Sequence, residues 1–404
     1  MSFETLDQKI LRGIGVLVLI GVLAVGLLVA GVWFEHRAPL ELPRPTGAFA
    51  VGRTTFHWVD DAHPDEFAPL PGSPRELLVW VWYPARPGGA TPAEYLPGPW
   101  RDALARNGGV LMSEFLTRDL AQVRVHSTEN LDLAPAQQRY PVVILRAGLA
   151  AQVTGYTVLA EDLASHGYIV VGPDAAYRTT VVVFPDGRLV LRPAQYDLER
   201  MPEVMQESFA TQLQKMWSTD VGFVVDKLTQ LDAPRSGRFA GRLDLQHLGI
   251  FGHSLGGATA AYFCHEDRRC KAGIDLDGAL HGPVSDEGLQ QPFMFVLEDH
   301  HRVADSADVL SRIQSMYARL PADSRLRISL AGSNHFSFSD QILLKSPLLQ
   351  AMMRRVGIMG GLQGARGLAI TADYVRSFFD VYLKGQPRTT LTALARRYPE
   401  VRVE

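Results

Sequence analysis

One serine near the middle of the chain has the spacing of a hydrolase nucleophile. Ser254 lies in GHSLG, residues 252–256, with a glycine two positions away on each side. In the G-x-S-x-G pattern, small glycines permit a strained turn that exposes the serine hydroxyl. The pattern is short enough to occur by chance, and the alternative is a serine in an ordinary tight turn. The flanking sequence distinguishes these two interpretations.

The residues on either side of Ser254 predict the junction that such a nucleophile requires. Residues 247–253 (HLGIFGH) are typical of a buried strand, and residues 255–264 (LGGATAAYFC) are typical of a helix. Ser254 is therefore expected at a strand-to-helix turn, and we interpret it as a nucleophile. We interpret His253, the residue before it, as packing within the turn.

A serine hydroxyl needs a histidine to accept its proton and a carboxylate to orient that histidine. Where the motif opens a strand-to-helix turn, both partners follow the serine in the chain. The histidines after the serine are His265, His281, His300, His301 and His335. The first two lie in a helix-end turn or too close to the acid candidates, and the adjacent pair precedes the last predicted strand. His335, in SNHFSF, is expected on a late loop that can reach the serine.

The carboxylate that would orient this histidine has more than one candidate. Asp275 and Asp277 end the run GIDLDG, and Glu298 and Asp299 end the next run, FVLED. Both runs predict strands, so either strand end can place a carboxylate near the histidine. Asp275 is expected inside its strand, whereas Asp277 is expected at the strand end. Spacing alone leaves Asp277 and the pair of Glu298 and Asp299 open.

Predicted strands and helices alternate along the wider chain. Apolar, β-rich runs predict strands at 76–84, 140–148, 168–174, 247–253, 271–278, 291–298 and 326–332. Helical periodicity predicts helices at 153–167, 201–231, 255–264 and 371–383. Asp186-Gly187 predicts a hairpin turn. The alternation predicts an α/β fold, with a mainly parallel central sheet covered by helices on both faces.

The composition is that of a globular protein with a large core. Of the 404 residues, 47% are hydrophobic and 21% are charged, and the formal net charge is −3. Acidic and basic residues are interspersed, so the chain lacks the basic stripe that nucleic-acid binding requires. We therefore expect no nucleic-acid partner. The sequence shows no repeat of about 20 to 50 residues, which argues against solenoids and propellers.

The N-terminal region differs from the rest of the chain. Residues 13–34 contain 22 residues without a charge. At about 1.5 Å per residue they are long enough to cross a hydrocarbon core of about 30 Å. Lys9 and Arg12 precede the run as in a signal peptide. The run, however, exceeds the usual length of about 7–15 residues, and no clear A-x-A cleavage site ends it. These features favour an uncleaved anchor.

The anchor divides the chain into four expected parts. They are a tail at 1–12, a transmembrane signal anchor at 13–34, a proline-rich linker at 35–49 and an α/β catalytic domain at 50–404. The linker is expected to be a stiff spacer. The membrane is an expected partner, and the catalytic domain is expected on the extracytoplasmic side. Positive residues flank the anchor at both ends, so the positive-inside rule does not determine this orientation.

Two cysteines bear on the compartment. Cys264 and Cys270 lie in a polar turn between a predicted helix and a predicted strand. Behind a secretory-type anchor an oxidising compartment favours a disulfide between them, whereas a cytosolic protein would keep two thiols. The run Cys264, His265, Glu266, Asp267 is not expected to bind a metal, because consecutive residues rarely converge on one ion. We expect no metal and no cofactor.

Several of these segments resemble one family of hydrolases. They are YPVVILRAGLAAQVTGYTVLAEDLASHGYIVVGPD at 140–174, GHSLGG, the aspartate of AGIDLDGA and SNHFSFSD. These segments resemble the platelet-activating factor acetylhydrolase family of α/β-hydrolases, in its plasma and type II intracellular branch, with bacterial carboxylesterase-like relatives. The resemblance extends from about residue 50 to the C-terminus. It implies an α/β-hydrolase fold and a triad of Ser254, His335 and Asp277.

The resemblance also implies an oxyanion hole formed by the backbone N–H groups of Leu149 and Leu255. One position departs from the family pattern. The family usually has His-Gly before the oxyanion leucine, whereas this chain has Ala147-Gly148. Backbone donors survive this change, but it can alter the shape of the loop and of the acyl pocket.

The sequence therefore predicts a membrane-anchored serine ester hydrolase that works through an acyl-enzyme intermediate. Its expected substrates are short-chain acyl esters or phospholipid-like esters near a membrane, and the short-chain preference is implied by the resemblance. The alternatives are a lipase or an acyltransferase with the same triad, and a catalytically silent, anchored binding protein on the same scaffold.

Overall fold

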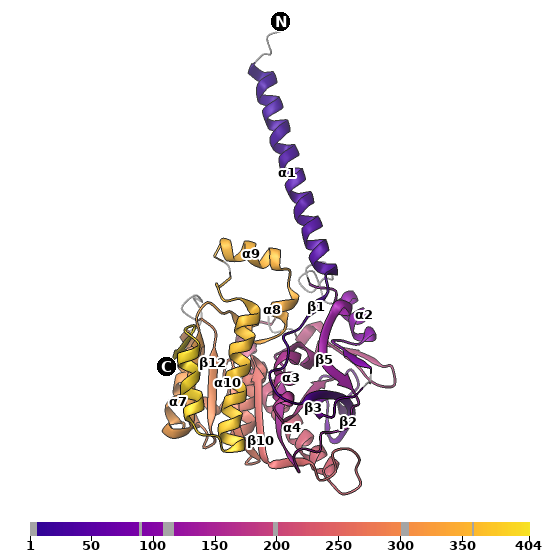
Figure 1. The fold of residues 1–404 in the computed structure, drawn as a ribbon, viewed down its shortest axis with the longest axis vertical. Helices are drawn as coiled ribbons and strands as arrows, with labels where there is room; N and C mark the ends of the chain where they lie inside the picture. The colour runs from indigo at the N-terminus through magenta and orange to yellow at the C-terminus, as the bar shows by residue number, and fades with distance from the viewer. Residues whose placement is uncertain (1–5, 89–90, 108–116, 197–200, 300–306, 358) are drawn as a thin grey trace.

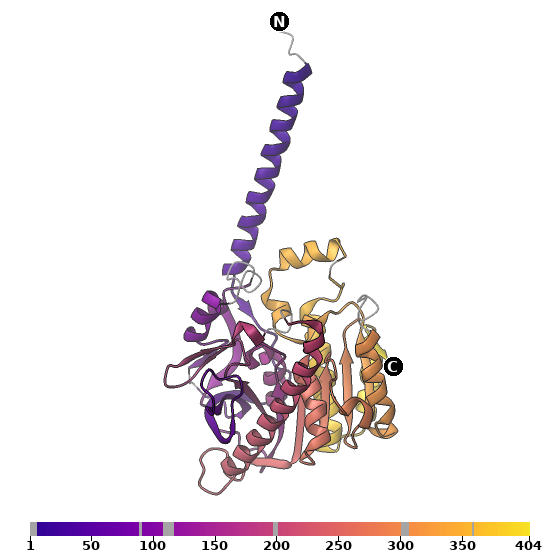
Figure 2. The same cartoon turned by 180° about the vertical axis from the view of Figure 1, so that it is seen from behind.

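One long helix and one large sheet dominate the structure (Figure 1). The computed structural model describes residues 6–404, except 89–90, 108–116, 197–200, 300–306 and 358. Helix α1 (Leu6–Arg37) projects from one end of a domain that contains the sheet. Figure 2 shows the same arrangement from behind, with α1 again extending beyond every other element.

The sheet has a parallel centre. Its order in space is β1-β5-β2-β3-β7-β6-β10-β11-β12-β13-β14, and β4 pairs with β5. The parallel strands are β7 (Ile169–Ala175), β6 (Tyr140–Arg146), β10 (Leu243–His253), β11 (Cys270–Leu276), β12 (Phe293–Leu297) and β13 (Arg325–Leu330). The mainly parallel sheet predicted from the sequence is therefore confirmed.

Further strands of mixed direction extend the sheet at both edges. They are β1 (Leu40–Glu41), β2 (Ala50–Pro64), β3 (Pro74–Ala85), β4 (Pro92–Glu94) and β5 (Val123–Glu129) at one edge and β14 (Val401–Val403) at the other. Within the first group, β1 and β2 run parallel to β5. A separate hairpin, β8 (Val181–Val183) and β9 (Leu189–Leu191), turns at Gly187, whose φ is 84°. It is the hairpin expected from Asp186-Gly187.

Helices cover both faces of the sheet. Helices α3 (Thr157–Ser165), α10 (Gly364–Lys384) and α11 (Thr389–Arg397) pack on one face. Helices α4 (Glu203–Leu231), α5 (Leu255–Glu266) and α7 (Ala307–Arg319) pack on the other. Side chains of β6 alternate between the two cores, with Val143 and Leu145 in one and Val142 and Ile144 in the other. An unbroken apolar run thus fills two cores, because successive residues of a strand point to opposite faces.

Four further α-helices belong to the described part of the fold. They are α2 (Gly98–Asn107), α6 (Val284–Glu287), α8 (Gln341–Leu344) and α9 (Pro347–Arg355). Helix α9 lies at the end of the domain from which α1 projects (Figures 1 and 2). Its contact with α1 brings the N-terminal and C-terminal parts of the chain together at that end.

Helix α1 is longer than the predicted anchor and is fixed at its C-terminal end. The sequence predicted an apolar segment at 13–34, and the segment Leu11–Arg37 of the helix is long and apolar enough to cross a membrane. The guanidinium of Arg118 donates to the carbonyl of Glu35 (3.0 Å) and to that of Ala38 (3.3 Å). Arg118 therefore satisfies carbonyl groups that the end of a helix leaves without partners.

The segment 35–49 differs from the expected spacer, because it packs against the domain. Leu42 is buried. The amide of Thr46 donates to the carboxylate of Asp162 (2.9 Å), and the amide of Gly47 donates to the hydroxyl of Ser165 (2.9 Å). These backbone groups pair with side chains of α3, so the segment follows the surface of the domain and cannot act as a free tether.

The expected disulfide joins Cys264 to Cys270. It connects the last turn of α5 to the first residue of β11, and the two Cα atoms lie 5.0 Å apart. Both cysteines are buried. Ser254 precedes the first residue of α5, and the bridge lies at the other end of this helix. The bridge therefore stabilises the connection between α5 and β11 without contacting Ser254.

We predict that reduction of Cys264–Cys270 lowers the melting temperature modestly and leaves the protein folded. In the chain-entropy model, a loop this short contributes about 2 kcal/mol. Calorimetry of the protein with and without reductant measures the difference, and the Cys264→Ala/Cys270→Ala variant is the matched comparison. An unchanged melting temperature on reduction of protein shown by mass spectrometry to carry the bridge would contradict the prediction.

Candidate active site

Ser254 occupies a strained turn at the carboxyl end of the central strand β10. Its φ is 56° and its ψ is −131°, a conformation that residues other than glycine rarely adopt. The amide of Ser254 donates to the carbonyl of Leu276 in β11 (2.9 Å). Its carbonyl accepts from the amides of Gly257 (2.8 Å) and Ala258 (3.1 Å) in the first turn of α5. The strand-to-helix turn expected from the motif is therefore present, and it is fixed on both sides.

Close packing requires the two glycines that flank Ser254. A Cβ on Gly252 would lie 2.2 Å from the carbonyl oxygen of Gly256. A Cβ on Gly256 would lie 2.3 Å from the carbonyl oxygen of Arg146, at the end of β6. Any larger residue would push α5 away from the sheet, so the glycines allow the turn to sit directly against two neighbouring strands.

His335 and Asp277 form a hydrogen-bonded pair. The Nδ1 atom of His335 lies 2.7 Å from Oδ2 of Asp277. The other carboxylate oxygen accepts from the amide of Glu298 at 2.9 Å, and the side chain of Asp277 is only 2% exposed. A carboxylate only accepts hydrogen bonds, so Nδ1 carries the proton and the neutral ring keeps its basic lone pair on Nε2.

A short capped turn sets the backbone of this histidine. His335 opens the 3₁₀ turn η7 (His335–Phe338), which follows β13. The side chain of Asn334 accepts from the amide of Phe336 (3.0 Å), and the hydroxyl of Ser337 accepts from the amide of Asn334 (3.0 Å). This reciprocal capping orders a turn that would otherwise be an irregular loop.

The other acid candidates have different partners. Asp275 is buried inside β11 and accepts from the amide of Gly278 (2.7 Å), and burial raises the pKa of its carboxyl well above the usual value. Asp299 accepts from the amide of Gly332 (2.8 Å). Glu298 contributes its backbone amide to Asp277. The structure therefore pairs the histidine with the acid that the resemblance implies.

The remaining histidines after the serine lie elsewhere or outside the described residues. His265 contacts the carbonyl of Gly288 (2.8 Å), and His281 pairs with Glu207 (2.8 Å). His300 and His301 fall outside the residues that the structure describes.

The loop after β6, which carries Leu149, lies directly against the serine. A Cβ on Gly148 would lie 3.2 Å from the Cβ of Ser254. The next residue, Ala150, has a φ of 63°, and its carbonyl accepts from the hydroxyl (2.6 Å) and the amide (3.2 Å) of Thr180. The loop is thus held beside the turn in one conformation.

Leu255, the second implied oxyanion residue, is the first residue of α5. The N–H groups in the first turn of a helix have no partner within the helix, so they are open to an external acceptor. Leu149 and Leu255 lie in one apolar cluster with Phe67, Ala210, Leu213, Met216, Trp217, Tyr177, Tyr196 and Phe209. The cluster surrounds both leucines with apolar side chains, and low polarity strengthens any hydrogen bond made there.

His253 packs in the turn, as interpreted from the sequence, and it also makes two hydrogen bonds. Its Nδ1 atom lies 2.8 Å from the hydroxyl of Tyr156, and its Nε2 atom lies 2.8 Å from the carbonyl oxygen of His335. Burial, followed by the nearby His335 side chain, lowers the pKa of His253 to about 3. The sequence held one indication of these hydrogen bonds, which was a histidine next to the proposed nucleophile in an otherwise apolar strand.

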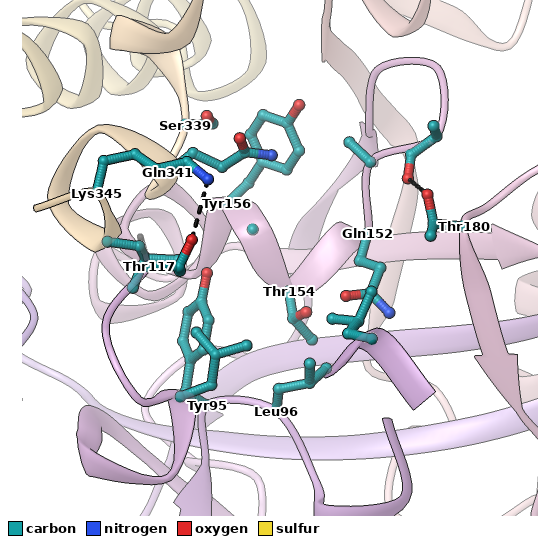
Figure 3. Close-up of a pocket in the computed structure, with 16 residues that line it drawn as sticks. Tyr95, Leu96, Thr117, Gln152, Thr154, Tyr156, Thr180, Ser339, Gln341 and Lys345 are labelled. Carbon is teal, nitrogen blue, oxygen red and sulfur yellow. Dashed lines mark hydrogen bonds between the residues drawn. The ribbon is translucent and has the colours of Figure 1, made fainter. Parts of the chain in front are cut away.

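A small cavity of about 70 Å³ lies on the other side of the loop (Figure 3). Gln152, Tyr156, Thr117 and Lys345 are among the residues that line it, and the Lys345 ammonium donates to the Thr117 hydroxyl (3.0 Å). Burial lowers the pKa of Lys345. The cavity therefore lies between the loop after β6 and the segment of Thr117 and Arg118, which contacts the end of α1.

Comparisons with known proteins agree with this arrangement. The family model described as platelet-activating factor acetylhydrolase, isoform II, matches residues 93–183 and 198–380. A platelet-activating factor acetylhydrolase of Canis lupus familiaris is 23% identical over 322 residues, which are 74% of this chain and 68% of the relative. A probable 1-alkyl-2-acetylglycerophosphocholine esterase of Arthroderma benhamiae is 27% identical over 165 residues, which are 38% of this chain and 42% of the relative.

A solved structure is similar over most of the chain. It is a ferulic acid esterase from Streptomyces cinnamoneus, with a TM-score of 0.75 and 30% sequence identity. The match covers 91% of this chain and 99% of that one. The predicted α/β-hydrolase fold is thereby confirmed.

We predict that Asp277→Asn lowers kcat for a simple ester by about 10⁴-fold, because the histidine loses the acceptor that fixes its tautomer. Asp299→Asn is the matched control at the end of the neighbouring strand, and it should retain most of the activity. Steady-state kinetics of both variants on p-nitrophenyl acetate test the assignment. The opposite result, with Asp299→Asn inactive and Asp277→Asn active, would transfer the acid role to β12.

Proposed function

The chain belongs to the platelet-activating factor acetylhydrolase isoform II family, and from that membership we propose a catalytic triad of Ser254, His335 and Asp277. The protein is a carboxylesterase-like serine hydrolase, in agreement with its relatives and its structural neighbour. The observation that carries the proposed triad is the 2.7 Å contact between His335 and Asp277 beside a serine held at positive φ.

In the proposed mechanism, the Ser254 hydroxyl attacks the ester carbonyl while Nε2 of His335 accepts its proton. Asp277 keeps Nδ1 protonated and stabilises the positive ring that forms. The oxyanion accepts hydrogen bonds from the backbone amides of Leu149 and Leu255. His335 then returns the proton to the leaving alcohol, and water releases the acyl group by the same steps in reverse order. The chain itself supplies the proposed nucleophile, the proton acceptor and the oxyanion donors.

We further propose that α1 crosses a bilayer and holds the active site at its surface. The end of the apolar run is docked on the domain: Val32 is 2% exposed, and a Cβ on Gly31 would lie 3.2 Å from the side chain of Leu348. The carboxylate of Glu35 accepts from the amide of Leu348 (2.9 Å) and from the hydroxyl of Ser346. Helix α9 therefore begins at the level where the apolar run ends.

The exposed surface of α9 supports this placement. Met352, Met353 and Val356 are exposed, and Arg354 and Arg355 lie between them. Exposed apolar residues interleaved with arginines are typical of helices that lie in a membrane interface. Helix α9 also follows the His335 turn closely in the chain, through α8. The bilayer would thus lie next to the active-site end of the domain, and the disulfide favours the extracytoplasmic side.

The proposed substrates are short-chain acyl esters or phospholipid-like esters at or near that surface. The names of the relatives support an acetyl ester. The name of the structural neighbour, a ferulic acid esterase, and the aromatic side chains around Leu149 favour a second candidate, an ester of an aromatic acid. A panel of p-nitrophenyl esters of increasing acyl length, with methyl ferulate and a short-sn-2-chain phospholipid beside it, separates these substrates.

We predict that a fluorophosphonate probe labels the protein at one site and that Ser254→Ala abolishes both labelling and ester hydrolysis. Ser236→Ala, which removes an exposed hydroxyl far along the chain from the motif, should leave both unchanged. Intact-protein mass spectrometry measures the labelling. Failure of the wild-type protein to react would contradict the proposed mechanism and would favour a silent binding protein.

We predict that a chain shortened to begin at residue 38 is soluble and keeps its kcat on p-nitrophenyl acetate. That boundary retains β1 and Leu42, which pack on the domain. On a short-chain phospholipid ester in vesicles it should lose at least about tenfold in activity, because it is no longer concentrated at the surface. Full-length protein in the same vesicles is the control. Equal activity of both forms on the vesicle substrate would contradict the proposed role of α1.

A further inference from the structure

Three hydrogen bonds connect the two halves of the proposed active site through buried side chains. The amide of Gly148 lies 3.3 Å from the hydroxyl of Tyr156, which lies 2.8 Å from Nδ1 of His253. The Nε2 atom of His253 lies 2.8 Å from the carbonyl oxygen of His335. Tyr156 is 1% exposed and His253 is 5% exposed. We call this series of contacts the Tyr156–His253 link.

The chemistry of the partners determines the direction of every bond in the link. A backbone carbonyl only accepts, so Nε2 of His253 carries a proton and donates to His335. The ring is neutral near pH 7, because burial holds the pKa of His253 at about 3. Its Nδ1 atom is therefore an acceptor, and it receives the hydroxyl proton of Tyr156. The tyrosine oxygen is left to accept from the amide of Gly148.

The link joins parts of the site that the sheet holds on separate strands. Gly148 follows β6 and precedes Leu149, whose amide we assign to the oxyanion hole. His335 follows β13, and strands β10, β11 and β12 lie between β6 and β13. The rings of His253 and His335 also pack together, with centroids 4.5 Å apart. The link thus connects the loop that carries Gly148 and Leu149, here called the oxyanion loop, to the turn that carries His335. It does so through the side chains of Tyr156 and His253, and it passes the turn that carries Ser254.

We propose that Tyr156 and His253 are positioning residues that hold the oxyanion loop and the His335 turn in their relative places for the transition state. This proposal rests on the proposed triad and oxyanion hole. Neither side chain is assigned a contact with the ester, so both act through Gly148 and His335. Misplacement by about 1 Å at such a site costs up to about 10²-fold in rate, because transition-state hydrogen bonds depend steeply on geometry.

A purely structural role makes a different prediction. Tyr156 belongs to the apolar core on the α3 face of the sheet, and Phe would preserve its ring there. If the hydroxyl only satisfies buried polar atoms, Tyr156→Phe lowers the melting temperature and leaves kcat unchanged. If the link positions the site, the same variant lowers kcat while KM stays nearly constant.

The test uses the full-length protein with p-nitrophenyl acetate. Tyr156→Phe should lower kcat by about 10- to 100-fold and change KM by no more than about twofold. Tyr374→Phe is the matched control, because Tyr374 is also buried and its hydroxyl has no hydrogen-bond partner among the described residues. It should leave kcat at the wild-type value. An unchanged kcat in folded Tyr156→Phe would overturn the proposal.

Two histidine variants separate the two ends of the link. His253→Gln retains a donor for the His335 carbonyl and loses the acceptor for Tyr156, whereas His253→Asn can retain that acceptor and loses the donor. Both should lower kcat. The double variant Tyr156→Phe/His253→Gln should be no slower than the slower single variant, because both changes break the same hydrogen bond. Fully additive losses would overturn the link even if each single variant were slow.

The pH dependence of kcat/KM provides an independent readout. Because His253 stays neutral, the wild-type profile should contain no ionisation that belongs to His253. An ionisation near neutral pH that disappears in His253→Gln would contradict the assigned bond directions. Failure of the proposed function is distinguishable, because it would abolish fluorophosphonate labelling of the wild-type protein. A labelled wild type with fully active Tyr156→Phe would refute the link alone.

Discussion

The tight turn at Ser254 is the constraint on which the site depends. The turn presses against two strands at once: its amide donates to the carbonyl of Leu276, and Gly256 leaves no room for a side chain beside Arg146. Leu276 immediately precedes Asp277, and Arg146 lies shortly before Leu149. The turn therefore contacts the backbone before Asp277 and the backbone before the loop that carries Leu149, and a change in the turn would move both.

Buried polar groups hold the framework around this turn. Asp174, at the end of β7, accepts from the amide of Val153 (3.0 Å) and from the indole of Trp80 (2.9 Å), and burial raises its pKa to about 7. These bonds fix the far end of the loop that begins at Gly148. The guanidinium of Arg146 donates to the carbonyl of Pro173 (2.6 Å) and lies 4.1 Å from the ring centre of Trp217. The loop is thus anchored at both ends before any substrate binds, and this preorganisation is what an oxyanion hole requires.

The C-terminal end of α1, the proposed membrane anchor, is held on the domain in one orientation. A free spacer would let the domain rotate, whereas the contacts of Glu35 and Arg118 set one orientation of the helix on the domain. If α1 crosses a bilayer, the direction in which the active site faces is therefore determined by these contacts. A short path then connects membrane and site, from α9 through α8 to the turn at His335.

The sequence alone determined the features that depend on local pattern. Continuous apolar, β-rich runs predicted the parallel strands, and period-3.6 apolar spacing predicted their helices. Glycine spacing predicted the turn at Ser254, because these preferences act within a few residues. Residue spacing left the acid open, because the carboxyl ends of β11 and β12 meet at one edge. The family resemblance implied Asp277, and the tertiary structure brings that carboxylate to His335. It also showed the link through His253 and the packing of the segment 35–49. Those contacts join residues far apart in the chain, so strand order and loop path decided them.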